Sequence, residues 1–178
     1  MTTADIVGND WDVLIIGDGS GSSWDIGCGW ASVLFQKHQR TRKLFYGSMS
    51  CGTSMIAEVM PYLQAMQWFQ STQAKALRET LHKPIIEVSV ISDNQTVVRQ
   101  GNKEIQAGKL SPFWSAWRNL MSEGYRDRFY HLGRQTHPVN ALCDYISGQS
   151  RLSIQALTLE KMLPGDEPFS LYSICPDL

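Results

Sequence analysis

Four carboxylates lie along the chain at positions from which they can form one site. Asp18 and Asp93 each follow a buried apolar run, Glu58 lies in the first turns of a predicted helix, and Asp144 lies in the last predicted helix. Parallel neighbouring strands end at the same sheet edge, where α/β sheets bind ligands. Four carboxylates there repel one another and need cations, and hard oxygen ligands suit Mg²⁺ or Mn²⁺. Two such ions can clamp the attacking and leaving oxygens of a phosphodiester, so the pattern indicates phosphodiester hydrolysis.

Each of these acids also has an ordinary explanation when it is taken alone. Asp18 can be a turn residue in Asp-Gly-Ser-Gly, and Asp93 can cap the helix that follows it. Glu58 can be a first-turn acid favoured by the helix dipole, and Asp144 can be a solvated helix residue. For any single acid the ordinary explanation is favoured, whereas the joint pattern favours a shared site.

The elements that must position the acids follow from the apolar spacing. Branched apolar runs predict three strands and then two more, at 11–16, 27–35, 43–48, 85–91 and 128–132. Helical spacing predicts a long helix from 53 or 54 to about 76, with 81 as an alternative end, and helices at 95–101, 111–123 and 138–147. The first strand is expected to end in a flexible turn at 17–21, and Gly148 is expected to stop the last helix. Pro61 is awkward inside the long helix.

This order of elements predicts the fold class and the domain organisation. We expect an α/β protein with a mixed five-stranded sheet, three antiparallel strands followed by two parallel ones, and helices on both faces. Residues 11–148 form the predicted catalytic domain, 1–10 an N-terminal extension and 149–178 a C-terminal extension of unknown role. The four cysteines have no CxxC pair, which indicates reduced thiols. Without a signal-peptide core or an apolar run of membrane length, the expectation is a cytoplasmic protein. A monomer is expected, because no interface patch is evident in the sequence.

The charge balance excludes a generally basic nucleic-acid coat protein. Sixteen Lys and Arg residues oppose seventeen Asp and Glu residues, which gives a net charge of −1. No acid occurs between Asp25 and Glu58, a segment that holds a cluster of basic residues: Lys37, Arg40, Arg42 and Lys43. We interpret this hairpin as a candidate phosphate-contact patch, the alternative being a solvated turn.

The acid-bearing motifs, in their order along the chain, resemble those of the ribonuclease H type 1 family. Asp18-Gly19-Ser20 resembles the first-strand motif of the family, and 53–58 resembles the helix entry that carries its second acid. Ser92-Asp93-Asn94 resembles the end of its fourth strand, and 137–144 resembles its last loop and helix. Each motif alone is weak, but the ordered set is fairly specific and covers roughly 11–148.

The resemblance implies an endoribonuclease that cleaves the RNA strand of RNA–DNA hybrids, with two Mg²⁺ or Mn²⁺ ions held by Asp18, Glu58, Asp93 and Asp144. One ion would hold the attacking water and the other would stabilise the leaving 3′ oxygen, while 2′-hydroxyl groups identify the RNA. Positions that match substrate contacts of the family are Gly19, Ser20, Asn94, Gln95 and Asn140. We add Trp24, because its turn is expected to be exposed near the acids.

Several positions depart from the family pattern. Many members have a mobile loop histidine before the last helix, and here Arg134 and His137 compete for that place. Arg134 is a candidate substrate contact. His137 can shuttle protons, since its charge changes near neutral pH, or it can be a loop residue without chemistry. Met55 and Ile56 replace an asparagine pair, and the basic helical handle of some members is absent.

Other functions remain as alternatives. A Holliday-junction resolvase or an exonuclease can use the same fold, although proofreading-type exonucleases need Asp-x-Glu in the first motif, where this chain has Asp18-Gly19-Ser20. A catalytically inactive hybrid-binding module is a third possibility, which the retention of all four acids argues against. An unrelated α/β protein with scattered acids is the fourth.

Overall fold

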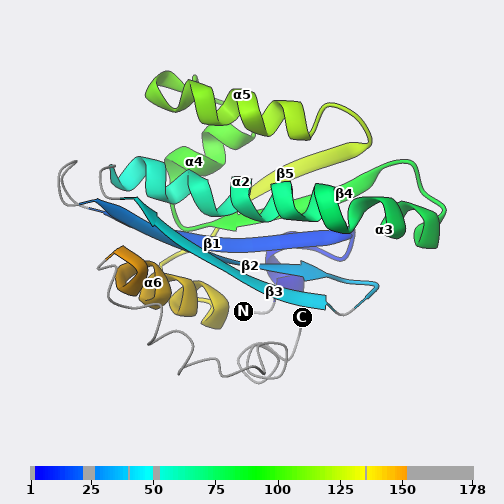
Figure 1. The fold of residues 1–178 in the computed structure, drawn as a ribbon, viewed down its shortest axis with the longest axis horizontal. Coiled ribbons are helices and arrows are strands. Elements are labelled where there is room, and N and C mark those ends of the chain that lie inside the picture. Colours follow the sequence, from blue (N-terminus) through cyan, green and yellow to red (C-terminus); the bar gives the residue numbers. More distant parts are fainter. Residues whose placement is uncertain (1–2, 22–26, 40, 50–52, 135, 152–178) are drawn as a thin grey trace.

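In a computed structural model the chain forms a five-stranded sheet flanked by helices (Figure 1). The structure describes residues 3–21, 27–39, 41–49, 53–134 and 136–151. The strands are β1 (Val13–Gly21), β2 (Cys28–Gln36), β3 (Thr41–Met49), β4 (Ile86–Ser92) and β5 (Tyr125–His131). The helices are α1 (Thr3–Val7), α2 (Ser54–Thr72), α3 (Ala74–Leu81), α4 (Gln95–Gly101), the 3₁₀ turn η1 (Gly108–Leu110), α5 (Ser111–Leu120) and α6 (Pro138–Arg151).

The sheet has the predicted mixed topology. Its strand order is β3-β2-β1-β4-β5, with β1–β2 and β2–β3 antiparallel and β1–β4 and β4–β5 parallel. The order and directions confirm the prediction of three antiparallel strands followed by two parallel ones. β1 and β4 are parallel neighbours, so their carboxyl ends meet at one edge as expected.

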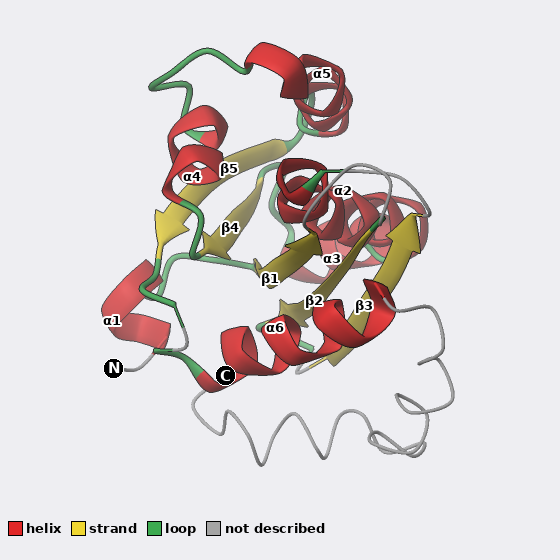
Figure 2. Ribbon diagram, turned by 90° about the vertical axis from the view of Figure 1, so that its left-hand side faces the viewer, coloured by secondary structure: helices red, strands yellow, loops and turns green. Residues whose placement is uncertain are grey.

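Helices cover both faces of the sheet, and each face has its own apolar core (Figure 2). The successive residues Val13 and Leu14 of β1 are both fully buried, because Val13 faces the core under α2, α4 and α5 while Leu14 faces the core under α6. This alternation explains why the first strand is a continuous apolar run. None of the described helices is long and apolar enough to cross a membrane.

The first strand is longer than predicted. The expected turn at 17–21 belongs to β1, since Gly17 pairs with Ser32 and Gly21 pairs with Cys28. The glycines suggested a turn, but antiparallel pairing with β2 keeps this segment extended. Asp18 therefore lies inside the strand, opposite Ala31, and does not follow its end.

The long helix is continuous through Pro61 but divides near its end. α2 runs to Thr72, Gln73 interrupts it, and α3 then continues to Leu81. Inside α2, the carbonyl of Pro61 accepts a hydrogen bond of 3.0 Å from Ser32 Oγ of β2. Packing on the sheet thus retains a residue that an isolated helix would tolerate poorly.

Helical structure extends beyond both ends of the predicted 11–148 range. The prediction that Gly148 stops the last helix is wrong, because α6 continues to Arg151 while packed on the sheet. In this packing the backbone nitrogen of Arg151 would lie 2.4 Å from a Cβ placed on Gly29. At the other end, the unpredicted helix α1 contributes the buried Val7 to the core under α6. A helix of five residues is too short for apolar periodicity to reveal.

Candidate active site

Three of the predicted acids converge at the carboxyl end of β4. Asp18 comes from β1, Glu58 from α2 and Asp93 from the residue after β4, and one carboxylate oxygen of each lies within 4.8 Å of the others. Paired residues of the parallel strands explain the meeting of the two aspartates. Ile16 pairs with Ile91, so both aspartates lie two residues beyond the same rung of the sheet.

The fourth acid joins the cluster from α6. Nη2 of Arg134 lies 3.4 Å from Oδ1 of Asp144, and Nε of the same guanidinium lies 4.0 Å from Oδ2 of Asp93. The charge of Asp144 also contributes to raising the pKa of Asp18. The structure therefore brings all four predicted carboxylates together, with an arginine that the prediction placed nearby as a substrate contact.

Their surroundings exclude the ordinary explanations for three of these acids. Asp18 lies within a strand, so it is not a turn residue. The N-cap of α4 is Asn94, whose Oδ1 accepts hydrogen bonds from the two amide groups at 96 and 97, so Asp93 does not cap that helix. Asp144 is 26% exposed and contacts Arg134, which differs from a freely solvated position.

Burial and mutual repulsion disfavour the charged forms of these acids. Burial, together with the charge of Asp93, raises the pKa of Asp18 to about 8. Burial, together with the charges of Asp18 and Asp93, raises the pKa of Glu58 to about 8. Burial also raises the pKa of Asp93, while the Arg134 guanidinium opposes that rise. At neutral pH the cluster therefore needs protons or cations to balance its charge.

The donor set fits a divalent metal ion. Oδ2 of Asp18 and Oε2 of Glu58 are buried and accept no hydrogen bond from the residues that the structure describes. Buried carboxylate oxygens of this kind are costly unless a proton or a cation compensates them. Asp18, Glu58 and Asp93 can hold such an ion with hard oxygen ligands, the kind that Mg²⁺ and Mn²⁺ prefer.

Gly19 lets the first two acids approach each other. A Cβ at this position would lie 2.3 Å from the backbone carbon of Ala57 and 2.6 Å from the backbone nitrogen of Glu58. The missing side chain therefore allows α2 to pack directly on β1. Gly19 itself donates its amide to Oδ1 of Asp18 at 2.8 Å, which fixes the orientation of that carboxylate.

We expect Gly19→Ala to destabilise the protein and to separate Asp18 from Glu58. The added methyl group must displace helix backbone, and overpacking of this kind costs about 1–3 kcal/mol. Urea unfolding measures the loss. Gly148→Ala is the matched control, because a Cβ at Gly148 in α6 meets nothing within 4 Å and should stabilise that helix slightly. Equal stability of the Gly19→Ala variant and the unaltered protein would contradict this prediction.

Arg134 forms ion pairs with Asp93 and Asp144, two of the four acids that the resemblance assigns to metal binding. Its side chain is 73% exposed, so the ion pairs stabilise the fold little, but a metal ion must compete with them. We expect Arg134→Ala to bind Mn²⁺ about two- to fivefold more tightly, as measured by calorimetry. Arg126→Ala removes a comparable exposed ion pair, with Glu87, and should not change the affinity. Weaker Mn²⁺ binding by Arg134→Ala would contradict the competition.

One histidine lies near the acids and another does not. His131, at the exposed end of β5, places Nε2 3.2 Å from the backbone oxygen of Asp93, a proximity that its place on a short strand did not reveal. His137 is 2% exposed, with Nε2 3.2 Å from Thr3 Oγ1 and Nδ1 accepting the amide of Val139. These contacts enclose the ring between the N-terminal segment and the start of α6, which favours the alternative that His137 has no part in chemistry.

The other predicted substrate contacts differ in their accessibility. Ser20 is partly exposed on β1, and Gln95 is exposed in the first turn of α4. The side chain of Asn94 caps α4 and donates to Sδ of Met55 at 3.8 Å, so it is already engaged. Asn140 is fully buried in α6, which makes direct contact with a substrate sterically implausible in this structure.

The predicted phosphate-contact hairpin lies away from the acids. Its turn joins Gln36 to Thr41 beside Val13, five residues from Asp18 along β1. Lys37 donates its ammonium to the carbonyl of Asn9. Arg42, a predicted phosphate contact, is 5% exposed. It lies opposite Phe35 of β2, and its guanidinium lies over that ring, 5.8 Å from the centroid. Arg40 and Trp24 lie outside the described residues.

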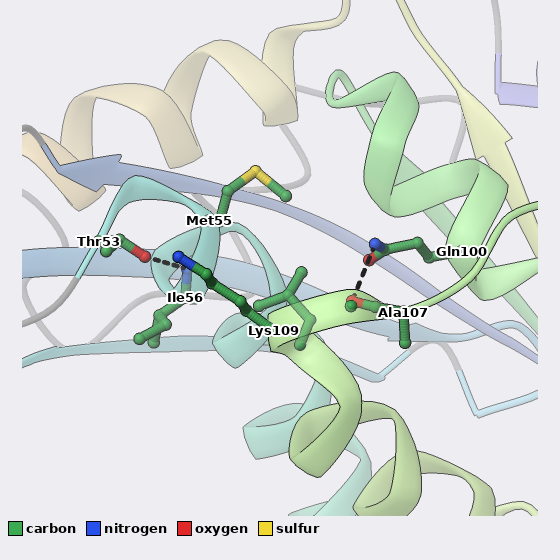
Figure 3. A pocket seen from close by; sticks show the side chains of 8 residues that line it. Thr53, Met55, Ile56, Gln100, Ala107 and Lys109 are labelled. Atoms are coloured by element: carbon green, nitrogen blue, oxygen red, sulfur yellow. Dashed lines mark hydrogen bonds between the residues drawn. The ribbon is translucent and has the colours of Figure 1, made fainter.

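A pocket of about 610 Å³ opens beside the first turn of α2 (Figure 3). Its lining combines that turn with the end of α4 and with η1: Thr53, Met55, Ile56, Gln100 and residues 107–110. Met55 lines the pocket and lies on α2 one turn before Glu58. Its Sδ also contacts the side chain of Asn94, which directly follows Asp93, so Met55 lies between the pocket and the acid cluster. Lys109 adds a cation to the lining that the sequence did not single out, since the three-residue turn η1 is too short to show periodicity.

Solved ribonuclease H domains have a similar fold. The RNase H1 called LC11, in complex with an RNA/DNA hybrid, matches with a TM-score of 0.64 and 18% identity over 79% of this chain and 97% of that one. RNase H1 of the halophilic archaeon Halobacterium salinarum matches with a TM-score of 0.59 and 16% identity, over 79% of this chain and 98% of that one. The N-terminal RNase H domain of Rv2228c from Mycobacterium tuberculosis matches with a TM-score of 0.58 and 17% identity, over 79% of this chain and 94% of that one. No protein-family model and no curated protein matches the sequence. The chain therefore has the ribonuclease H fold.

Proposed function

We propose that this protein is a metal-dependent endoribonuclease that hydrolyses the RNA strand of RNA–DNA hybrids. The observation that carries the proposal is the convergence of Asp18, Glu58 and Asp93 within 4.8 Å, with Asp144 joined to them through Arg134. The cluster lies where the parallel pairing of β1 with β4 ends, at the carboxyl end of β4, and ligands of such sheets usually bind at this edge.

The four acids would hold the divalent ions, two in number as the family resemblance implies. Bound Mg²⁺ or Mn²⁺ supplies positive charge and an activated water for phosphodiester hydrolysis. Asp18 and Glu58 are suited to this role because each has a buried carboxylate oxygen that accepts no hydrogen bond from the described residues. Gly19 orients Asp18 through its amide, and Arg134 restrains Asp144 at the edge of the cluster.

The choice of an RNA–DNA hybrid as substrate rests on the motif resemblance and on the fold. LC11 RNase H1, which has this fold, is described in complex with an RNA/DNA hybrid. In this chain Ser20 and Gln95 are accessible residues close in sequence to Asp18 and Asp93, and we assign them to contacts with the hybrid backbone or sugar. Arg134 is exposed beside the acids and can contact a phosphate of the bound strand.

The experiment that tests the proposal is cleavage of an end-labelled RNA–DNA hybrid with Mg²⁺ and, separately, with Mn²⁺. Duplex RNA, duplex DNA and a four-way DNA junction of the same sequence are the competing substrates. We expect cleavage within the RNA strand of the hybrid alone. Binding of the hybrid without cleavage in either metal would support an inactive hybrid-binding module. Cleavage of the junction without cleavage of the hybrid would support a resolvase.

A further inference from the structure

Tyr62 connects the two strands that lead to the first and third acids. It lies on α2 one turn after Glu58, and its side chain is fully buried. The hydroxyl oxygen lies 3.0 Å from the carbonyl oxygen of Gly17 on β1 and 3.2 Å from the carbonyl oxygen of Ile91 on β4. A single O–H group thus bridges two neighbouring strands.

The bridge lies where the pairing of β1 with β4 ends. The last paired residues of the two strands are Ile16 and Ile91. Asp18 directly follows Gly17, and Asp93 lies two residues after Ile91, so the hydroxyl joins the strands immediately before both acids. Repulsion between two carboxylates at this position acts to separate the strand ends.

The ring of Tyr62 is held firmly in this place. A Cβ on Gly17 would lie 2.9 Å from Cε1 of Tyr62, so the ring occupies the space that a side chain at Gly17 would need. On another side the ring meets Phe129 of β5 edge to face, with centroids 6.2 Å apart and an interplanar angle of 85°. The position of the hydroxyl is therefore set by contacts of Tyr62 with three strands, β1, β4 and β5.

We propose that Tyr62 is a positioning residue of the acid cluster, whose hydroxyl holds β1 at Gly17 and β4 at Ile91 together so that Asp18 and Asp93 can share the same cations. This inference rests on the proposed metal-dependent function. Tyr62 does not touch the substrate. It acts through the backbone on the separation of two carboxylates that belong to different strands.

The test compares Tyr62→Phe with Trp117→Phe. The first substitution removes only the bridging hydroxyl. The second removes another buried donor, since Nε1 of Trp117 donates to Oδ2 of Asp127 at 2.7 Å, on an element that carries none of the acids. Calorimetry measures the Mn²⁺ dissociation constant of each variant without substrate. Urea unfolding measures stability, and sucrose is added to both variants so that they are folded during the titration.

For Tyr62→Phe we expect an Mn²⁺ dissociation constant about tenfold higher than that of the unaltered protein, corresponding to the loss of one buried hydrogen bond. Hybrid cleavage should fall in kcat with little change in KM, because the substrate contacts remain. Trp117→Phe should lose at least as much stability and keep its Mn²⁺ affinity within about twofold.

The outcomes separate this inference from the proposed function. Unchanged Mn²⁺ affinity in Tyr62→Phe overturns the positioning role, and so does an equal loss of affinity in Trp117→Phe, which would trace the effect to general destabilisation. If the unaltered protein binds no Mn²⁺, the proposed metal-dependent function is itself contradicted, independently of the result for Tyr62→Phe.

Discussion

Asp93→Asn is expected to abolish hybrid cleavage while leaving the fold intact. The substitution keeps the size of the side chain but removes the charge that binds cations, and loss of an electrostatic contact to the transition state typically costs about 10²–10³-fold in rate. Because Asp93 lies within 4.8 Å of two other carboxylates, we expect a loss at the upper end of that range or beyond it. Cleavage of a labelled hybrid in Mg²⁺ measures the rate, and circular dichroism measures the fold.

A surface acid provides the matched control for this substitution. Glu104 has a side chain that is 55% exposed, pairs with Arg99 at 3.7 Å and is not a member of the acid cluster. Glu104→Gln also removes one negative charge, and it should leave the cleavage rate within about twofold. Near-normal cleavage by Asp93→Asn, or an equal loss of cleavage in Glu104→Gln, would show that the acid cluster does not take part in the cleavage reaction.

The second large effect is a loss of stability of the metal-free protein as the pH rises. The pKa values of Asp18 and Glu58 are about 8 in the folded protein, against about 4 for such carboxyl groups in an unfolded chain. Between these values the folded state holds more protons than the unfolded state, so the free energy of unfolding falls with increasing pH. The slope is up to about 1.4 kcal/mol per pH unit for each proton involved.

Urea unfolding in EDTA at pH 5.5, 7.0 and 8.5 should therefore show decreasing stability. Saturating Mn²⁺ should restore stability most strongly at pH 8.5, where the carboxylates are deprotonated and bind the ion without releasing protons. Asp18→Asn should flatten the pH dependence in EDTA and reduce the gain from Mn²⁺. A flat profile for the unaltered protein in EDTA would show that these acids are not raised in pKa.

The sequence predicted three antiparallel strands followed by two parallel ones, and a shared position for the four acids, because local signals were strong there. The branched apolar run ending at Ile91 identified the strand before Asp93, and the confirmed parallel pairing with β1 brought Asp18 beside it. The extent of β1 escaped prediction because it depends on pairing of Gly21 with Cys28 in another strand. The burial of Arg42 escaped prediction for the same reason, since it follows from its partner Phe35.

The supporting residues of the site escaped prediction because their roles depend on contacts between distant segments. Tyr62 fits the helical pattern of a core residue, and its bridging position becomes evident only from its contact with Gly17, 45 residues earlier. His137 contacts Thr3 across 134 residues, and that contact depends on a short helix without a periodic pattern. Apolar spacing identifies which faces are buried but does not indicate which polar atoms meet.

The origin of the four acids also bears on when the proposed site is completed during synthesis of the protein. Asp18, Glu58, Asp93 and Asp144 come from β1, α2, the end of β4 and α6, so they span 127 positions of the chain, 18 to 144. A nascent chain can pair its first three strands and dock α2 before α6 has left the ribosome, because those contacts are closer in sequence. The last carboxylate arrives only with α6, so no shorter folding intermediate carries the complete set. If the proposed nuclease activity is confirmed, its appearance would therefore report the docking of α6.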